Sequence, residues 1–267
     1  PGILEVNDSN GRNRTNVNRL IISTRAGLDV VTRPFTVKMR SDCFVRTRDI
    51  VALLEKYIST ENGLFRDKGY SVFQQRVLTA SWVARDARGS LPFLFHPGDI
   101  FLAGRTEDIR LFFAAPLATC EIYSRVYAPG MTSAWRYVPE QWLWINAIKL
   151  RTGKMVYQGN FETSPALVES SEQFFLANFI PFSARRLGLS WPKYWRKYPL
   201  RGLFSLYTTG RWQELYASTY GLEFPGSRKR IMRFFIALWR FGYILREYLL
   251  RCTLLRRVAH YFFVHHE

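Results

Sequence analysis

Cysteine is scarce in this sequence, and long apolar runs are missing from it. The three cysteines, Cys43, Cys120 and Cys252, have neither the number nor the spacing of a disulfide framework or a zinc site. We therefore expect a reducing compartment. Because no run of 18 or more apolar residues occurs, the sequence predicts no membrane-spanning helix. The chain starts at Pro1 without an initiator methionine, so we expect a fragment or a processed chain that carries no signal peptide.

Apolar residues, in contrast, are plentiful enough to exclude disorder as the main state. Of the 267 residues, 48% are hydrophobic and 16% are aromatic, which is ample material for a core. A chain of this length buries roughly 75% of the surface that its unfolded form exposes. We expect one large domain over residues 1–225, followed by a basic helical tail over residues 226–267.

Acidic residues are few compared with basic ones, and the tail is especially basic. The chain has 38 Lys and Arg against 21 Asp and Glu, for a net charge of +17, which predicts a polyanionic partner. At about 100° per residue, Arg233 and Arg240 lie on one side of a tail helix and Phe234 and Leu238 on the other. Such a helix suits the headgroup layer of an anionic membrane; alternatively, it packs its apolar side on the core of the protein. No nucleic-acid-binding motif occurs, so nucleic acid is not an expected partner.

Strand-like and helix-like patterns alternate through residue 165. This alternation predicts an α/β domain with a mixed or mostly parallel sheet flanked by helices. The loop expected at residues 7–16 is polar and turn-rich, and the aromatic segment 185–226 is expected to wrap irregularly around the core. The predicted helices are 17–28, 50–58, 107–113 and 139–150, and the predicted strands are a buried one at 35–39, 71–84, 100–103 and one within 152–165.

The strand at residues 35–39 leads into the most informative candidate site. Lys38, Arg40 and Asp42 alternate, so at strand spacing their side chains share one side where the strand leaves the sheet. Ligands of open α/β sheets bind beyond the carboxyl ends of strands. Two cations and one carboxylate at this position can hold a diphosphate, and Asp42 can also reach a divalent metal bound to it. The alternative is an ion-pair network on the surface.

Several short motifs occur in a characteristic order. Together they resemble the WavE family of lipopolysaccharide-synthesis proteins, over about residues 1–150, whereas the tail matches only in being basic. Each motif is weak alone, and their joint order carries the specificity. The motifs are Asn16-Val17-Asn18-Arg19, Gly27-Leu28, Lys38-x-Arg40-Ser41-Asp42, Pro97-Gly98-Asp99-Ile100-Phe101 with Gly104 and Glu107-Asp108, and Pro139-Glu140-Gln141.

This resemblance implies a GT-A-like fold and a glycosyltransferase, with a hexosyltransferase expected. Its partners would be a nucleotide-sugar donor and a lipid-linked or lipopolysaccharide glycan acceptor. The basic amphipathic tail, independently of the resemblance, predicts an anionic membrane surface contacted by residues 228–267. The product would be a bacterial lipopolysaccharide or capsule glycan, made on the cytoplasmic face of the inner membrane. The first nucleotide-binding strand of the family would lie upstream of this sequence.

The resemblance also implies roles for basic and amide side chains in donor binding. Arg19, Lys38 and Arg40 would neutralise the diphosphate, and Asn18 would hydrogen-bond the ribose or the donor sugar. Fixed cations favour the transition state, because the leaving nucleoside diphosphate gains negative charge there. Asp42 lies where this fold class keeps its metal-binding carboxylate. Since the usual pair of carboxylates is reduced to a single Asp, the resemblance leaves two alternatives, a Mg or Mn cofactor at Asp42 or no metal cofactor.

Carboxylates supply the catalytic candidates. Glu140, at the predicted start of a helix, is our candidate general base on the acceptor hydroxyl, and Asp99 would orient donor or acceptor hydroxyls. Alternatively, Glu140 is only an acidic residue at a helix N-terminus, which stabilises the helix by about 0.3–1 kcal/mol. For Glu107 and Asp108 this structural role is favoured more strongly. His96 is a turn histidine by default, with an active-site role as the alternative.

A non-catalytic function is the second hypothesis. In it, the protein is a membrane-associated scaffold of a polysaccharide-assembly complex that docks through its tail and through segment 185–226. The triplet Lys38, Arg40 and Asp42 favours the enzyme, because a scaffold has no need for two cations and a carboxylate at a strand exit.

Overall fold

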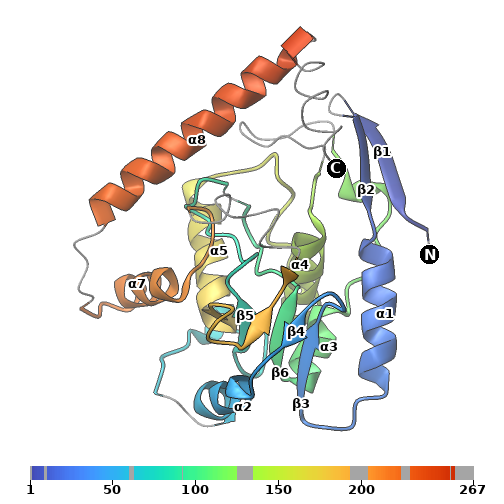
Figure 1. Cartoon of the computed structure of the whole chain (residues 1–267), viewed down its shortest axis with the longest axis vertical. Helices are drawn as coiled ribbons and strands as arrows, with labels where there is room; N and C mark the ends of the chain where they lie inside the picture. The colour runs from blue at the N-terminus through green and yellow to red at the C-terminus, as the bar shows by residue number, and fades with distance from the viewer. Residues whose placement is uncertain are drawn as a thin grey trace.

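The computed structural model has a mixed α/β architecture, with helices packed around a central sheet (Figure 1). The four strands of this sheet lie in the order β3-β6-β5-β7, where β5 and β7 are parallel and the other two pairs are antiparallel. The prediction of a mixed sheet is confirmed, whereas a mostly parallel sheet is not found. The strands are β3 (Phe35–Met39), β5 (Val77–Ala80), β6 (Phe101–Arg105) and β7 (Phe179–Phe182). The structure describes residues 2–8, 11–59, 63–91, 93–124, 135–192, 204–223, 229–252 and 254–255.

The strands of the sheet differ in burial. Strands β5 and β7 are buried at every residue, and β6 is buried up to Gly104, as expected for strands covered on both faces. Strand β3 lies at the edge, and its Phe35, Val37 and Met39 are exposed. The bounds predicted for this strand are therefore confirmed, but the expectation that it is buried is wrong.

The four predicted helices are present. Helix α3 contacts β3 and β6, and helices α1 and α4 both pack on α3. Helix α4 begins with a proline, whose fixed φ suits the first turn, and ends at Gly153 with φ +74°. The four helices are α1 (Val17–Asp29), α2 (Asp49–Leu54, continued by a π-helical turn over Glu55–Ser59), α3 (Thr106–Phe112) and α4 (Pro139–Thr152).

Other segments differ from the prediction. Most of the loop expected at residues 7–16 is instead strand: residues 7–8 belong to β1 (Leu4–Asp8) and residues 11–15 to β2 (Gly11–Thr15), and the two strands pair antiparallel. Segment 152–165 contains no strand among the described residues, and it leads into helix α5 (Pro165–Asn178). In the part of segment 185–226 that the structure describes, β8 (Leu189–Ser190) pairs with β4 (Phe44–Val45), and α7 (Thr209–Thr219) follows; residues 193–203 and 224–226 lie outside that part.

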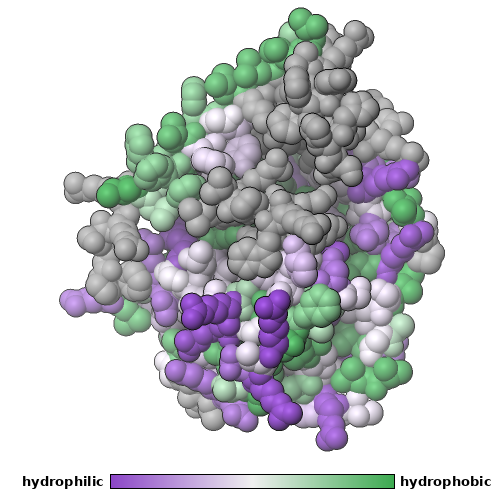
Figure 2. Space-filling model, in the orientation of Figure 1, coloured by the Kyte–Doolittle hydropathy of each residue, from purple (hydrophilic) through white to green (hydrophobic). Residues whose placement is uncertain are grey.

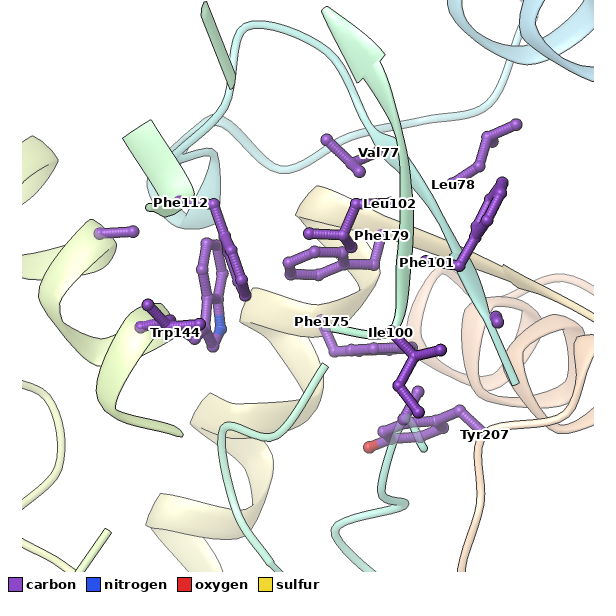
Figure 3. Packing of buried hydrophobic residues seen from close by; sticks show 14 of the residues in the cluster. Val77, Leu78, Ile100, Phe101, Leu102, Phe112, Trp144, Phe175, Phe179 and Tyr207 are labelled. Atoms are coloured by element: carbon purple, nitrogen blue, oxygen red, sulfur yellow. The ribbon is translucent and has the colours of Figure 1, made fainter. Parts of the chain in front are cut away.

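Aromatic side chains fill the core between the sheet and helices α4 and α5 (Figure 3). The Trp144 ring of α4 lies 4.8 Å from Phe179 and 6.1 Å from Phe112, measured between ring centroids. On the other side of α5, Phe175 stacks on Tyr207 at 4.1 Å. Such pairs contribute about 0.5–1.5 kcal/mol each beyond the burial of their area, so this core fixes the elements that carry the site.

An ion-pair network around two buried carboxylates, Asp86 and Glu172, joins α7 to α5. The Arg211 Nε of α7 donates to Asp86 Oδ2 at 2.7 Å. Arg88 donates two hydrogen bonds of 2.8 Å to the carboxylate of Glu172 on α5. The loop that follows β5 is thereby held between the two helices.

In the described part of the tail, helix α8 (Lys229–Arg251) lies along the outside of the body, on the opposite side from α1 (Figure 1). It contacts the body through Phe204, whose ring lies 5.8 Å from that of Phe235 and 5.9 Å from that of Trp239. Residues 226–228, 253 and 256–267 of the predicted tail lie outside the described residues. Within the described chain, every helix is too short or too polar to cross a membrane.

Candidate active site

Lys38 and Asp99 meet because β3 pairs with β6. The antiparallel register places Met39 opposite Phe101, and Arg40 N donates to Ile100 O at 3.1 Å. The end of β3 therefore lies beside the residue that precedes β6, and Lys38 Nζ donates to the backbone carbonyl of Asp99. Burial lowers the pKa of Lys38 and raises that of Asp99, while the attraction between the two charges opposes both shifts.

The turn that delivers Asp99 depends on Gly98. Thr79 Oγ1 on β5 donates to Pro97 O at 3.1 Å, and Gly98 then adopts φ +80°. A Cβ at this glycine would lie 2.6 Å from Val83 Cγ2, closer than van der Waals contact allows. Both the backbone conformation and the space therefore require glycine here.

Glu140 approaches the same place from the first turn of α4. Its Oε2 lies 3.6 Å from His96 Nε2, which is beyond hydrogen-bond distance. The Glu140 side chain is 20% exposed, and burial raises its pKa, although Arg85, Lys38 and Arg40 act in the opposite direction.

His96 is 8% exposed, and burial, followed by the positive charge of Arg85, lowers its pKa to about 3. The imidazole is therefore neutral at physiological pH. Its Nδ1 has no hydrogen-bond partner in the part of the chain that the structure describes. His96 thus lies beside Glu140 without a hydrogen bond to it, and its active-site role stays a prediction.

Arg40 and Asp42 pair with each other just beyond the end of β3. Arg40 Nε donates to Asp42 Oδ1 at 2.9 Å and Nη2 donates to Oδ2 at 3.1 Å. Arg40 thereby lowers the pKa of Asp42 to about 2. The strand ends at Met39 and a turn follows, so the expected strand-like alternation of Lys38, Arg40 and Asp42 is wrong. The charges of Lys38, Arg40 and Asp99 nevertheless act on one another.

Each carboxylate oxygen of Asp42 accepts a hydrogen bond from Arg40. Across the described residues, no group of three or more His, Cys, Asp and Glu side chains is placed to hold a metal ion. The described side chains around Asp42 therefore do not by themselves complete a divalent-cation site. A metal at Asp42 stays a prediction, and no step below is routed through it.

The other predicted donor-binding residues lie on α1. The amide of Asn18 is buried, where Nδ2 donates to Ala118 O at 2.9 Å and Oδ1 accepts from Ala118 N at 2.7 Å. Asn18 thus anchors α1 to the segment after α3. Arg19 is exposed. No hydrogen bond or ion pair within the described chain links either residue to Lys38, and their donor contacts stay predictions.

Glu107 and Asp108 have structural partners in the first turn of α3. Glu107 pairs with Arg110 at 2.5 Å. Asp108 accepts hydrogen bonds from the backbone N–H groups of Gln74 at 2.6 Å and Gln75 at 3.0 Å. These contacts support the helix N-terminal alternative for both residues.

Two residues of the site had no sequence signal. Arg85 N donates to His96 O at 2.9 Å, and the charge of Arg85 acts on His96 and Glu140. The Trp191 ring lies under the Arg40 guanidinium, 5.6 Å from its centroid. Neither residue belongs to a sequence motif or has a spacing that predicts a site, so only the folded structure shows that they lie at the cluster.

A separate cavity of about 310 Å³ lies between α1 and α3, lined by Arg25, Leu28, Asp29, Arg110 and Ala114. Its two arginines already donate to backbone carbonyls, Arg25 to Phe113 and Arg110 to Leu28. None of its lining residues belongs to the cluster of Lys38, Asp99 and Glu140.

Comparison with known proteins gives a family. The model described as WavE lipopolysaccharide synthesis matches residues 1–243. The match includes all of the site residues above and extends into α8, well beyond residues 1–150. A comparison with curated proteins and one with solved structures find no match. Since the match covers most of its length, the chain belongs to the WavE lipopolysaccharide synthesis family.

Proposed function

We propose that the protein is a glycosyltransferase, which moves a hexosyl group from a nucleotide-sugar donor to a growing lipopolysaccharide or capsule glycan. Membership of the WavE family implies a role in lipopolysaccharide synthesis. The observation that carries the proposal is the meeting of Lys38, Asp99 and Glu140, from three distant segments, in one partly buried cluster in which only Asp99 is fully enclosed. Buried charges with displaced pKa values are typical of active sites. We further propose a GT-A-like arrangement of the donor site.

Glu140 is the proposed general base. The acceptor hydroxyl attacks the anomeric carbon, the bond to the diphosphate oxygen breaks, and the hydroxyl proton passes to the Glu140 carboxylate. Because burial raises its pKa, this carboxylate is a stronger base than an exposed glutamate, which brings it nearer to the pKa that suits a general base at neutral pH. Its side chain is 20% exposed, which leaves a surface for substrate.

Lys38 and Arg40 are the proposed ligands of the diphosphate. The leaving group gains negative charge as the glycosidic bond breaks, so cations already in place stabilise the transition state more than the ground state. Lys38 is fixed by its hydrogen bond to Asp99 O. Arg40 uses Nε and Nη2 for Asp42, and its Nη1 is not part of that pair. Guanidinium groups suit phosphate because their N–H groups form a planar fork.

Asp99 is proposed to orient sugar hydroxyls and to keep Lys38 charged. The Asp99 charge favours the protonated form of Lys38, against the effect of burial. We place the reaction on the cytoplasmic face of the bacterial inner membrane, with a lipid-linked glycan as acceptor.

A ligand screen tests this proposal. The purified protein is melted with UDP-, GDP-, ADP- and dTDP-sugars, which all carry a diphosphate, and a donor present at 100 times its Kd should stabilise the fold by about 2.7 kcal/mol. Hydrolysis of the stabilising donor, in which water takes the place of the acceptor hydroxyl, is then followed by release of the nucleotide; Glu140→Gln should be inactive yet still bind. If none of the donors stabilises the protein, the scaffold is favoured and the proposal is wrong.

A further inference from the structure

We propose that α8 attaches the protein to an anionic lipid bilayer by lying in the headgroup layer with the apolar face that it turns away from the body. This inference goes beyond the proposed reaction and does not depend on it. It rests on which side of α8 the body contacts, on the residues of the other side and on the charge of the helix.

The body contacts one side of α8, where Phe235 and Trp239 are 43% and 38% exposed, less than the apolar residues of the other side. Phe235 and Trp239 pack on Phe204, and Arg240 Nη2 donates to Gly89 O at 3.4 Å. At about 100° per residue, these three residues of α8 fall within roughly 140° of one another. This arc is therefore the attached side of the helix.

The side opposite the attached one carries a continuous stripe of large apolar residues, which we call the outer stripe. Its seven members fall within an arc of roughly 100°, and each is between 46% and 66% exposed. Figure 2 shows hydrophobic residues along this edge of the molecule. The outer stripe consists of Ile231, Phe234, Leu238, Phe241, Leu245, Tyr248 and Leu249.

This arrangement bears on the two alternatives for the tail. If α8 packed its apolar side on the core, the outer stripe would be buried, and in the structure it is exposed. Single exposed apolar residues are normal on a soluble protein, but a continuous stripe of seven marks a surface that another body covers.

Charge favours an anionic membrane, rather than a second copy of this chain, as the surface that covers the outer stripe. Basic residues outnumber acidic ones on α8 by six to one, and the whole chain carries +17. Two copies joined along the outer stripe would bring these like charges together, whereas anionic headgroups would neutralise them. A helix of 23 residues that is amphipathic and basic, and that cannot cross the bilayer, fits the surface of the membrane.

Co-sedimentation with vesicles tests the proposal on the full chain. Vesicles that contain phosphatidylglycerol should bind the protein, and vesicles of phosphatidylcholine alone should bind it at least 10-fold more weakly. Raising the salt from 0.1 to 1 M should weaken binding, because the Debye length falls from about 10 to 3 Å.

Two triple variants separate the outer stripe from apolar surface in general. Phe234→Ser, Leu238→Ser and Phe241→Ser together should reduce partitioning at least 10-fold without any change in charge. Val30→Ser, Leu150→Ser and Leu222→Ser remove three exposed apolar residues elsewhere and should leave partitioning unchanged. Circular dichroism and thermal melting establish that both variants are folded.

Three results would overturn the proposal. The first is equal binding to the two kinds of vesicle, or to neither. The second is equal partitioning of the two triple variants. The third is a dimer, seen by sedimentation velocity without lipid, that the outer-stripe variant dissociates. Since vesicle binding requires neither donor nor acceptor, each of these results would leave the transferase proposal standing.

Discussion

Replacing Glu140 with glutamine removes a charge and keeps the shape of the side chain. If Glu140 is the general base, the variant loses transfer activity. Because burial raises the pKa of Glu140, the charged form is disfavoured in the fold, so the same variant should also be more stable than the wild type near neutral pH. The variant should therefore lose activity and gain stability, as expected for a residue whose charge serves catalysis and not the fold.

The size of each effect follows from the site. Loss of a general base typically lowers kcat by about 10²–10⁴-fold, or about 3–5 kcal/mol of transition-state stabilisation. Each unit by which burial raises the pKa of Glu140 disfavours the charged form by about 1.4 kcal/mol. In a chain of this length, 1 kcal/mol corresponds to roughly 2–4 °C in Tm.

The stability effect also has a defined pH dependence. A carboxyl whose pKa is raised by folding gives the fold its full stability at pH values below the pKa in the unfolded chain. That stability is lost as the pH rises through the higher pKa of the folded state. The Tm advantage of Glu140→Gln should therefore vanish near pH 4 and grow toward pH 8.

The assay combines nucleotide release with thermal unfolding between pH 4 and 8. Glu107→Gln is the matched control, because Glu107 also lies in the first turn of a helix but is exposed and paired with Arg110. The control should keep its activity and lose stability, by about 0.3–1 kcal/mol. If Glu140→Gln behaves like this control, Glu140 only stabilises the N-terminus of α4 and the reasoning is refuted.

Three further predictions concern the surroundings of the site. The pKa of His96 is about 3 in the fold, so the free energy of unfolding of the wild type, measured in urea, should decrease as the pH falls from about 6.5 toward 3. The contribution of His96 to this slope should approach 1.4 kcal/mol per pH unit, and it should be absent in His96→Gln. Arg211→Met should cost about 3–5 kcal/mol in urea unfolding, because it leaves the buried charge of Asp86 without its cation, although the Arg88 backbone N–H still donates to it. Arg14→Met breaks an exposed pair with Glu5 and should cost at most about 1 kcal/mol. Gly98→Ala should lower both Tm and transfer activity by displacing Asp99. Gly153→Ala is the control, because Gly153 has a similar φ of +74° but lies in open space, and it should lower Tm only slightly. Equal losses of Tm in the two variants would show that the Val83 contact is unimportant.

Helix ends and strand bounds near the site could be predicted from local signals. Pro139 and Gly153 mark the two ends of α4, and the apolar run at 35–39 gives the bounds of β3. The meeting of Lys38, Asp99 and Glu140 was not deducible from spacing, because it depends on the pairing of β3 with β6 and on the position of α4. Only the order of family motifs pointed to these residues as a group.

The missed elements lacked the usual patterns. Helix α5 has a readable start, since Ser164 caps it and Pro165 follows. Its last turns, however, are buried on all sides, so no polar face produces a helical period. Strands β1 and β2 are mostly polar in sequence, which is typical of a loop. In β3 the apolar side chains indicated burial, but an edge position leaves them exposed.

The central claim is that cations beside this carboxylate cluster bind the diphosphate of an activated sugar. Isothermal titration calorimetry with the nucleoside diphosphate of the stabilising donor tests it directly, comparing wild type with Arg40→Gln and with Arg151→Gln, an equal charge change at the far end of α4. We expect Arg40→Gln to weaken binding at least 10-fold and Arg151→Gln to leave it unchanged. Equal affinities in all three proteins, or no binding by any of them, would contradict the account.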